Sequence, residues 1–287
     1  MCDELTPEEL AAASAISRRR FGLVGGAAVL AACQGTGVAG VSGGVRESAV
    51  IVTTHDGNAD AWFFHPAKGK HPGIVMWPDI AGIRDANMVM ARRLAAAGYA
   101  VLLVNQYYRS ARAPIMATIS EWRTPEGQAK LKPMIAAISP AGTLRDAAAF
   151  VAWLDRQAAV DAKRGIGSNG YCMGGPFAVR TAVAAPDRVR AAASLHGAAL
   201  VTDAPDSPHR LLGETKAAFL FAIARNDDAR APGEKDALQA AAQAAGRKAD
   251  VKVYAADHGW TVPDAPVYDQ AEAERAWSRM IALFAAL

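Results

Sequence analysis

The chain has 287 residues, of which 52% are hydrophobic and 21% are charged, a composition typical of one large globular domain and not of a disordered chain or a fibre. Its formal net charge is only +3, and an arginine triplet at 18–20 supplies as many positive charges. A nucleic-acid-binding protein would carry a basic stripe, so we expect no nucleic-acid partner.

Residues 1–33 have the features of an export signal peptide. The pair Arg18-Arg19 and the nearby Phe21 precede an apolar run from Gly22 to Ala32. That run is about half as long as the roughly 20 residues of a membrane-spanning helix, which is typical of the h-region of a signal peptide. The arginine pair resembles the twin-arginine signal, which exports folded proteins across the inner membrane.

The apolar run ends in Leu30-Ala31-Ala32-Cys33, which resembles the bacterial lipobox, where the chain is cut before a cysteine that carries a lipid. A plain cleavage site after small residues is the alternative, and it also predicts export. We therefore expect a periplasmic protein that touches a membrane, inner or outer, only through a lipid on Cys33. The glycine-rich stretch 34–47 has the composition of a flexible tether.

From Ser48 onward, short apolar runs alternate with longer amphipathic ones, which predicts one α/β domain over 48–287. An Asp-Gly turn at 56–57 predicts a hairpin between the first two strands. The expected strands are 49–54, 59–65, 73–77, 99–105, 164–172, 189–197, 217–224 and 251–256. The expected helices are 85–97, 139–157, 174–186, 232–246 and 271–287. This order predicts a mostly parallel, doubly wound sheet with helices on both faces.

The connection over 106–138 is longer than usual and carries apolar residues of its own. Loops of this kind often form lids over a site. A surface helix packed on the core is an equal alternative, so the sequence leaves the two open.

The stretch "GSNGYCMGG" at 167–175 places Cys172 between a predicted strand and a predicted helix. This is the context of a nucleophile elbow, a sharp turn that glycines at the flanking positions make sterically possible. The helix N-terminus beside Cys172 favours a thiolate. Export would remove Cys2 and remove or lipidate Cys33, leaving Cys172 as an unpaired thiol where structural cysteines normally pair.

Two further strands end at residues that complete a catalytic set. Asp227 and Asp228 follow the strand at 217–224, and His258 follows the strand at 251–256. The order nucleophile, acid, histidine is that of α/β hydrolases. We favour Asp227 over Asp228 as the partner of His258. The backbone amides of Met173 and of the loop near Asp79-Ile80 would form the oxyanion hole.

The five other histidines lie in loops, in the hairpin turn or, for His196, at a strand end before Gly197, and none has the paired spacing of a zinc site. No phosphate-binding loop or dinucleotide fingerprint is present in the sequence. We therefore expect no metal and no cofactor.

The quoted stretches resemble the dienelactone hydrolase family, cysteine-dependent enzymes with the α/β-hydrolase fold. The resemblance is carried by "GYCMGG", the aspartate after "FAIARN", "DHGW" and "WPDIAGIRD...ARRLAAAGYAVLLVNQYYR", and it extends through nearly the whole domain. It implies a hydrolase of small ester or lactone substrates, with Cys172 as nucleophile, His258 as base and Asp227 as its orienting acid. It also implies that Ile80 and Met173 supply the oxyanion-hole amides.

The same resemblance places Arg109 at the family's carboxylate-binding arginine and Asp79 where the family carries a glutamate before isoleucine. Val262 occupies the position of a second carboxylate-binding arginine. One cationic group in place of two should bind a carboxylated lactone less firmly. Two other functions stay open: a cysteine acyltransferase or peptidase on this fold, and a non-catalytic binding protein.

Overall fold

This computed structural model describes residues 40–42 and 44–287. The predicted export signal, including Cys33, and residues 34–39 of the predicted tether lie outside the described residues. The later part of the predicted tether differs from the expectation, because Gly40 pairs with Glu47 in an antiparallel ladder. Glycine content alone did not indicate this pairing, since backbone hydrogen bonds to a neighbouring strand need no side chain.

The described residues form a nine-stranded sheet in the order β1-β2-β3-β5-β4-β6-β7-β8-β9. The strands are β1 (Gly40–Ser42), β2 (Val45–Thr54), β3 (Gly57–Pro66), β4 (Gly73–Trp77), β5 (Ala100–Val104), β6 (Ile166–Tyr171), β7 (Val189–Leu195), β8 (Ala218–Ala224) and β9 (Ala249–Tyr254). Pairing is antiparallel from β1 to β3 and between β3 and β5, and parallel from β5 to β9. The predicted mostly parallel sheet is therefore confirmed, with an antiparallel edge.

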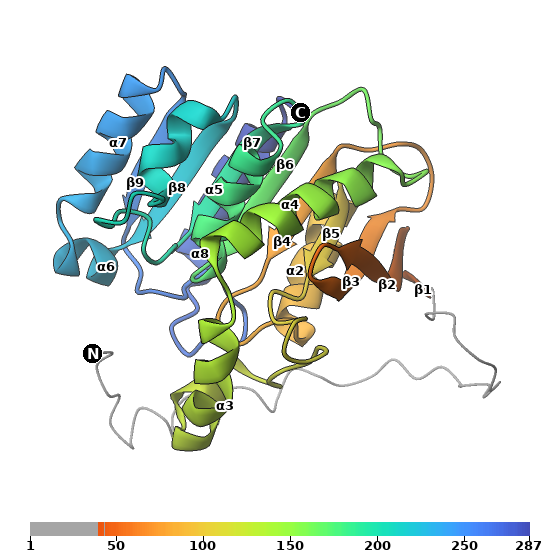
Figure 1. The fold of residues 1–287 in the computed structure, drawn as a ribbon, viewed down its shortest axis with the longest axis horizontal. Helices are drawn as coiled ribbons and strands as arrows, with labels where there is room; N and C mark the ends of the chain where they lie inside the picture. Colours follow the sequence, from red (N-terminus) through yellow and green to blue (C-terminus); the bar gives the residue numbers. More distant parts are fainter. Residues whose placement is uncertain (1–39, 43) are drawn as a thin grey trace. The chain divides into compact units, whose positions relative to one another are not determined.

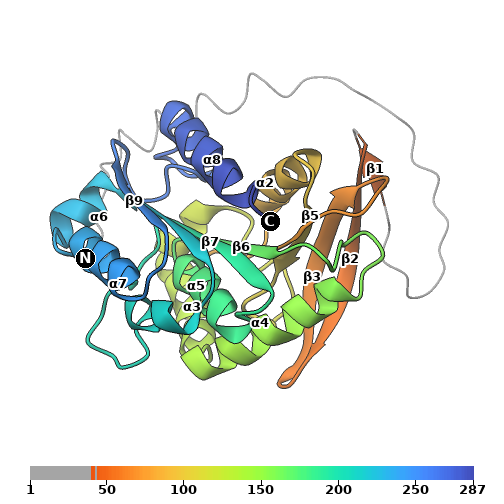
Figure 2. The ribbon, with the colours of Figure 1, turned by 90° about the horizontal axis from the view of Figure 1, so that it is seen from above.

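Helices cover both faces of this sheet (Figures 1 and 2). The α-helices are α2 (Asp85–Ala96), α3 (Pro125–Ala136), α4 (Pro140–Asp155), α5 (Gly174–Ala184), α6 (Arg225–Arg230), α7 (Glu234–Ala244) and α8 (Gln270–Phe284); η1 (Ile119–Arg123) and η2 (Pro208–Glu214) are 3-10 helices. Helices α2 and α8 lie on one face, and α4, α5 and α7 on the other. The sequence reading did not predict α6, η1 or η2, which are too short for a periodic pattern. No helix in the described part of the chain is long and apolar enough to cross a membrane.

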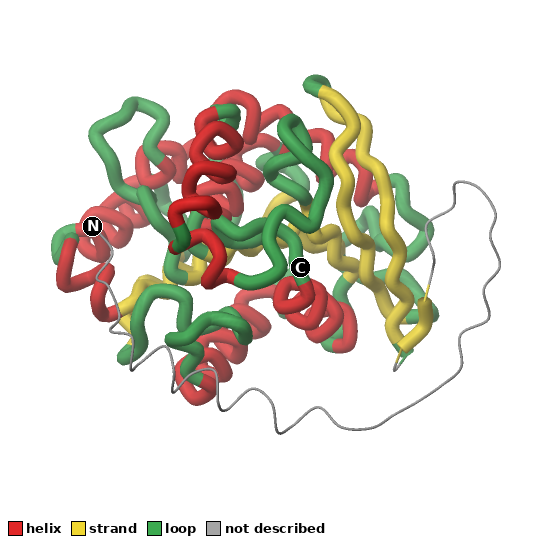
Figure 3. Tube along the Cα trace, turned by 90° about the horizontal axis from the view of Figure 1, so that it is seen from below, coloured by secondary structure: helices red, strands yellow, loops and turns green. Residues whose placement is uncertain are grey.

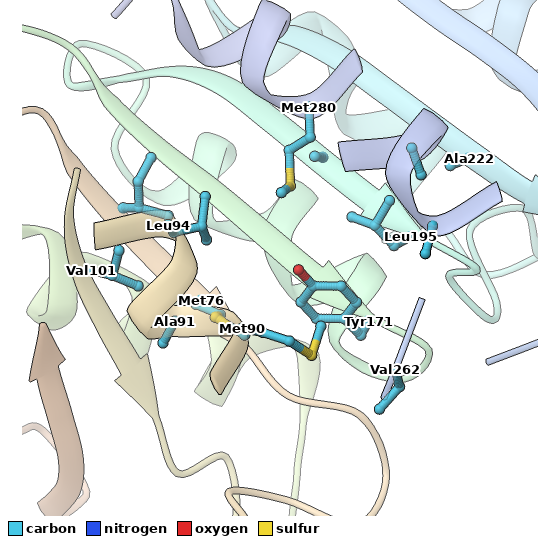
Figure 4. Packing of buried hydrophobic residues seen from close by; sticks show 14 of the residues in the cluster. Met76, Met90, Ala91, Leu94, Val101, Tyr171, Leu195, Ala222, Val262 and Met280 are labelled. Carbon is cyan, nitrogen blue, oxygen red and sulfur yellow. The ribbon is translucent and has the colours of Figure 1, made fainter. Parts of the chain in front are cut away.

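The inner strands are buried along their whole length, as for β4 and β5, because helices on both faces exclude water from parallel strands. Figure 4 shows the core on the α2 and α8 face, where Met90, Leu94 and Met280 pack with Tyr171 and Leu195 of β6 and β7. This packing anchors the strands whose ends carry the candidate site. The connections that follow the parallel strands lie on the side of the molecule where Figure 1 labels α3. Figure 3 shows the molecule from that side, with the connecting loops in green.

Candidate active site

Cys172 occupies a strained turn between β6 and α5. Its φ is 51°, in the left-handed region that side chains with a Cβ rarely adopt. The neighbouring glycines are required by close approach of the backbone: a Cβ on Gly170 would lie 1.9 Å from the Gly174 carbonyl oxygen, and one on Gly174 would lie 2.5 Å from that of Pro78. The local sequence therefore produces the sharp turn expected of a nucleophile elbow.

Backbone hydrogen bonds hold this turn against the end of β7. The Cys172 N–H donates to the Leu195 carbonyl oxygen at 3.0 Å, and the Cys172 carbonyl oxygen accepts from Ala198 N at 3.2 Å. The thiol is half-buried at the N-terminus of α5, where the helix dipole favours negative charge. Both backbone polar groups of Cys172 are therefore hydrogen-bonded, and the thiol is its reactive group.

His258 lies against Asp227, and Asp228 has a different partner. His258 Nδ1 is 2.6 Å from Asp227 Oδ2, while Asp228 accepts from Lys235 Nζ at 2.7 Å. Asp227 lies in the first turn of α6, and the Asn226 side chain accepts from the backbone N–H of His258 at 2.9 Å. The start of α6 therefore holds both the ring and the backbone of His258.

The proton affinity of His258 is raised by its neighbours. Burial alone lowers its pKa, but hydrogen bonds to Asp227 and to the Cys172 side chain, and the charges of both, raise the pKa to about 10. Since Nδ1 faces Asp227, Nε2 is the nitrogen left for a second partner. Cys172 is among the groups that raise the pKa of His258, so its side chain lies near the imidazole ring.

The loop after β4 carries Asp79 and Ile80 and is held by several hydrogen bonds. Gln106 donates to the Asp79 carbonyl oxygen and Tyr107 to that of Ile80, both at 2.7 Å. In the described part of the chain, no protein acceptor receives a hydrogen bond from the backbone N–H of Ile80 or Met173. Neither amide is therefore engaged by the described part of the protein.

The side chain of Asp79 is engaged with Arg84. Asp79 is 2% exposed and accepts two hydrogen bonds from the Arg84 guanidinium, each at 2.8 Å. Burial raises the pKa of Asp79, and the charge of Arg84 opposes that rise. Arg84 also donates to both oxygens of Asp264 at 2.7 and 2.8 Å, and Asp264 accepts from Ile119 N at 3.0 Å. One guanidinium thereby joins the loop of Ile80, the loop after His258 and the start of η1.

Arg109 is paired with two carboxylates of the protein. It donates twice to Asp56, at 3.2 and 2.5 Å, and twice to Asp146, at 2.7 and 2.8 Å. Its guanidinium also stacks over the ring of Tyr108. Val262, at the second expected carboxylate-binding position, is buried in the core.

The segment 106–138 packs on the residues that carry those two amides. Ile115, Met116 and Leu131 are buried with Ala81 and Tyr107 in a cluster against which Ile80 and Met173 pack. Further partly buried members of this cluster are Ala111, Ile119, Trp122, Met134, Ile135 and Ile138. The segment is thus an apolar wall beside the site, formed largely by η1 and α3.

His196 belongs to the same site, although the sequence reading did not select it. It follows β7, and its ring centroid lies 5.0 Å from that of His258. Its Nδ1 is 3.1 Å from the backbone N of Cys172. The sequence feature that could have indicated His196 is its position at the end of a predicted strand, as for the other candidate site residues.

Within the described residues, no group of three or more His, Cys, Asp or Glu side chains is placed to hold a metal ion.

Comparisons with known proteins identify the family of this chain. The profile described as "Dienelactone hydrolase family" matches residues 59–287. A Methylorubrum extorquens protein named "Putative carboxymethylenebutenolidase" is 27% identical over 251 residues, covering 85% of this chain and 82% of that protein. A Salmonella typhi protein of the same name is 24% identical over 250 residues, covering 85% and 88%.

A solved structure shows the same fold. The crystal structure named "Putative Dienelactone Hydrolase" from Klebsiella pneumoniae matches with a TM-score of 0.72 and 22% identity, covering 85% of this chain and 99% of that chain. At this identity the likeness concerns the fold, which is that of the α/β hydrolases.

Proposed function

Because the chain belongs to the dienelactone hydrolase family, we propose that it hydrolyses ester or lactone bonds with Cys172 as the nucleophile. The observation that carries this proposal is the His258–Asp227 pair, 2.6 Å apart, with Cys172 near enough to His258 to raise its pKa. A thiol, a base and an oriented acid in that order form the arrangement that activates a nucleophile for acyl transfer.

The reaction begins with the proton of the Cys172 thiol on His258 Nε2. The thiolate attacks the acyl carbon and forms the carbon–sulfur bond, while the carbonyl electrons move to oxygen. The N–H groups of Ile80 and Met173 donate to that oxyanion. When the carbon–oxygen bond to the leaving group breaks, His258 gives its proton to the departing oxygen. Water, deprotonated by His258, then cleaves the thioester, and the released thiolate completes the cycle.

The high proton affinity of His258 suits this role. A histidine with a pKa of about 10 is protonated at neutral pH, so the resting site holds an imidazolium beside the sulfur. Positive charge beside a cysteine favours the thiolate, which is the reactive form. Asp227 supports this charge through Nδ1 and keeps the other ring nitrogen directed at Cys172.

We further infer that the preferred acyl group is uncharged. The wall beside the two amides is apolar, and Arg109 is already paired with Asp56 and Asp146. Arg84 is likewise paired with Asp79 and Asp264. A substrate carboxylate would have to displace one of these protein carboxylates, whereas an apolar acyl group would pack directly against the wall.

The decisive experiment compares full-length wild-type protein with Cys172→Ala on p-nitrophenyl acetate and on dihydrocoumarin, an activated ester and a lactone. Rapid quenching and mass spectrometry should find wild-type protein carrying one acyl group on Cys172. Cys172→Ala should carry none and lose nearly all turnover. Equal turnover in the two proteins would contradict the proposal, and binding without turnover in wild type would favour a non-catalytic protein.

We also propose that residues 1–33 direct export and that Cys33 carries a lipid. This rests on the arginine pair and on the sequence Leu30-Ala31-Ala32-Cys33. Cells supplied with radiolabelled palmitate should label the wild-type protein and the Cys172→Ala control, but not Cys33→Ala. Replacing Arg18 and Arg19 by lysine should leave the protein unprocessed in the cytoplasm. Label on Cys33→Ala would overturn the lipid assignment, and processing of the double lysine variant would overturn the export assignment.

A further inference from the structure

A buried histidine connects the two loops that carry the proposed nucleophile and base. His196 is 1% exposed. Its Nδ1 lies 3.1 Å from the backbone N of Cys172, and its Nε2 lies 2.8 Å from Thr261 Oγ1. Thr261 is in the same loop as His258. One imidazole ring therefore spans the space between the turn of Cys172 and the loop of His258.

The protonation of His196 follows from these contacts. The Cys172 N–H is shared between the Leu195 carbonyl oxygen at 3.0 Å and His196 Nδ1 at 3.1 Å. Because a backbone N–H can only donate, Nδ1 is the unprotonated, accepting nitrogen. The proton lies on Nε2, which donates it to Thr261 Oγ1. Burial, together with the positive charge of His258, holds the pKa of His196 well below its usual value. The ring is therefore neutral, with both nitrogens engaged and neither free to exchange a proton with a substrate.

The backbone at His196 is itself held in an uncommon conformation. Its φ is 40°, and its N–H donates to the Ala222 carbonyl oxygen of β8 at 2.8 Å. Left-handed conformations at residues with a Cβ persist where surrounding contacts determine them, and they gather at functional sites. The Trp260 ring packs against the imidazole with centroids 5.2 Å apart. The ring is thus fixed from the sheet, from the turn of Cys172 and from the loop of His258.

We propose that His196 is a positioning residue that sets the distance between Cys172 and His258, with Nδ1 holding the turn and Nε2 holding Thr261. This inference rests on the proposed function, in which a proton passes between Cys172 and His258. Proton transfer requires the reacting atoms to lie within hydrogen-bond reach. The two hydrogen bonds of the His196 ring, called the strut below, would hold them at that distance. A displacement of about 1 Å in such a site costs about 10²-fold in rate. The strut acts through Cys172 and His258 and does not touch the substrate.

The sharpest test leaves His196 in place and changes its acceptor. Thr261→Val removes the hydroxyl at nearly constant volume, and Thr261→Ser keeps it. We expect Thr261→Val to lower kcat about tenfold, the loss of one well-placed hydrogen bond, with KM within about twofold of wild type. Thr261→Ser should retain near wild-type kcat. Equal kcat in the two variants, or a change confined to KM, would overturn the proposal.

Alkylation of Cys172 by iodoacetamide at pH 7 gives a second readout that needs no substrate. Thr261→Val should react more slowly than wild type, because His258 no longer lies where it supports the thiolate, and Thr261→Ser should react at the wild-type rate. A His258→Gln control separates the proposed function from the positioning role of His196. If that variant reacts as fast as wild type, the pairing of Cys172 with His258 in the proposed function is wrong. If His258→Gln is slow but Thr261→Val is not, the strut fails.

A double-mutant cycle tests whether His196 and Thr261 act as one unit. His196→Phe removes both hydrogen bonds of the ring, so adding Thr261→Val to it should lower kcat no further. Losses that multiply in the double variant would contradict a shared strut. If His196→Phe does not fold, the comparison of Thr261→Val with Thr261→Ser still decides the question.

Discussion

The Nδ1 atom of His258 lies 2.6 Å from Oδ2 of Asp227, although the two residues are 31 positions apart in sequence. The neighbouring Asp228 is held by Lys235 instead. Two adjacent carboxylates of similar exposure therefore have different partners: Asp227 contacts His258 and Arg230, and Asp228 contacts Lys235. This difference provides a matched control for the most direct mutational test.

Asp227→Asn should lower kcat/KM by about 10²- to 10⁴-fold, since the base loses its orienting carboxylate and its charge partner. Asp228→Asn should change kcat/KM little, because an exposed ion pair contributes about 1 kcal/mol or less to stability and does not touch His258. Steady-state hydrolysis of one neutral ester measures both. A larger loss in Asp228→Asn would reverse the assignment.

The pH dependence of kcat/KM should show an alkaline limb near pH 10. In the proposed reaction the His258 imidazolium donates the proton to the leaving oxygen, so activity should fall when His258 loses that proton through its pKa of about 10. Asp227→Asn removes a contact that raises this pKa, so the limb should move to lower pH, while Asp228→Asn should leave it unchanged. An alkyl ester, corrected for uncatalysed hydrolysis, is the suitable substrate. A wild-type limb near pH 7 would argue against the charged pair.

Arg109 should contribute to stability rather than to recognition of a substrate carboxylate. We expect p-nitrophenyl butyrate to be preferred over the p-nitrophenyl monoester of succinic acid, and Arg109→Gln to leave that preference unchanged. The same substitution should lower the free energy of unfolding by about 1–3 kcal/mol, because Asp146 loses a charged partner. Arg112→Gln, at an exposed position of the same segment, is the control. A selective loss of activity on the succinic monoester would instead show Arg109 binding the substrate.

Arg84→Met should destabilise the protein strongly. It leaves Asp79 buried without its partner and frees Asp264, and breaking a buried ion pair costs about 3–5 kcal/mol. Arg92→Met removes a partly exposed pair with Glu47 and should cost about 1 kcal/mol or less. Urea denaturation of the two variants measures the difference. Similar losses in both would mean that the Asp79–Arg84–Asp264 cluster is not a principal support of the loop that carries Ile80.

The amino-acid sequence by itself determined the parallel sheet, the glycine-framed turn at Cys172 and the order of Cys172, Asp227 and His258 at strand ends. These features depend on local periodicity and on the steric needs of single turns, which a linear pattern records. The sequence did not predict short elements such as α6 or the strand pairing of Gly40 with Glu47, because both depend on contacts with residues that only the fold brings close.

Only the tertiary structure decided which charged and polar groups meet. The sequence did not indicate that Asp56 and Asp146 surround Arg109, nor that Arg84 pairs with Asp79. His196 was one of several strand-end residues until β6 and β7 became neighbours. The physical reason is that hydrogen bonds and ion pairs act over a few ångströms in space, and residues far apart in sequence reach that range only after the strands are ordered and packed.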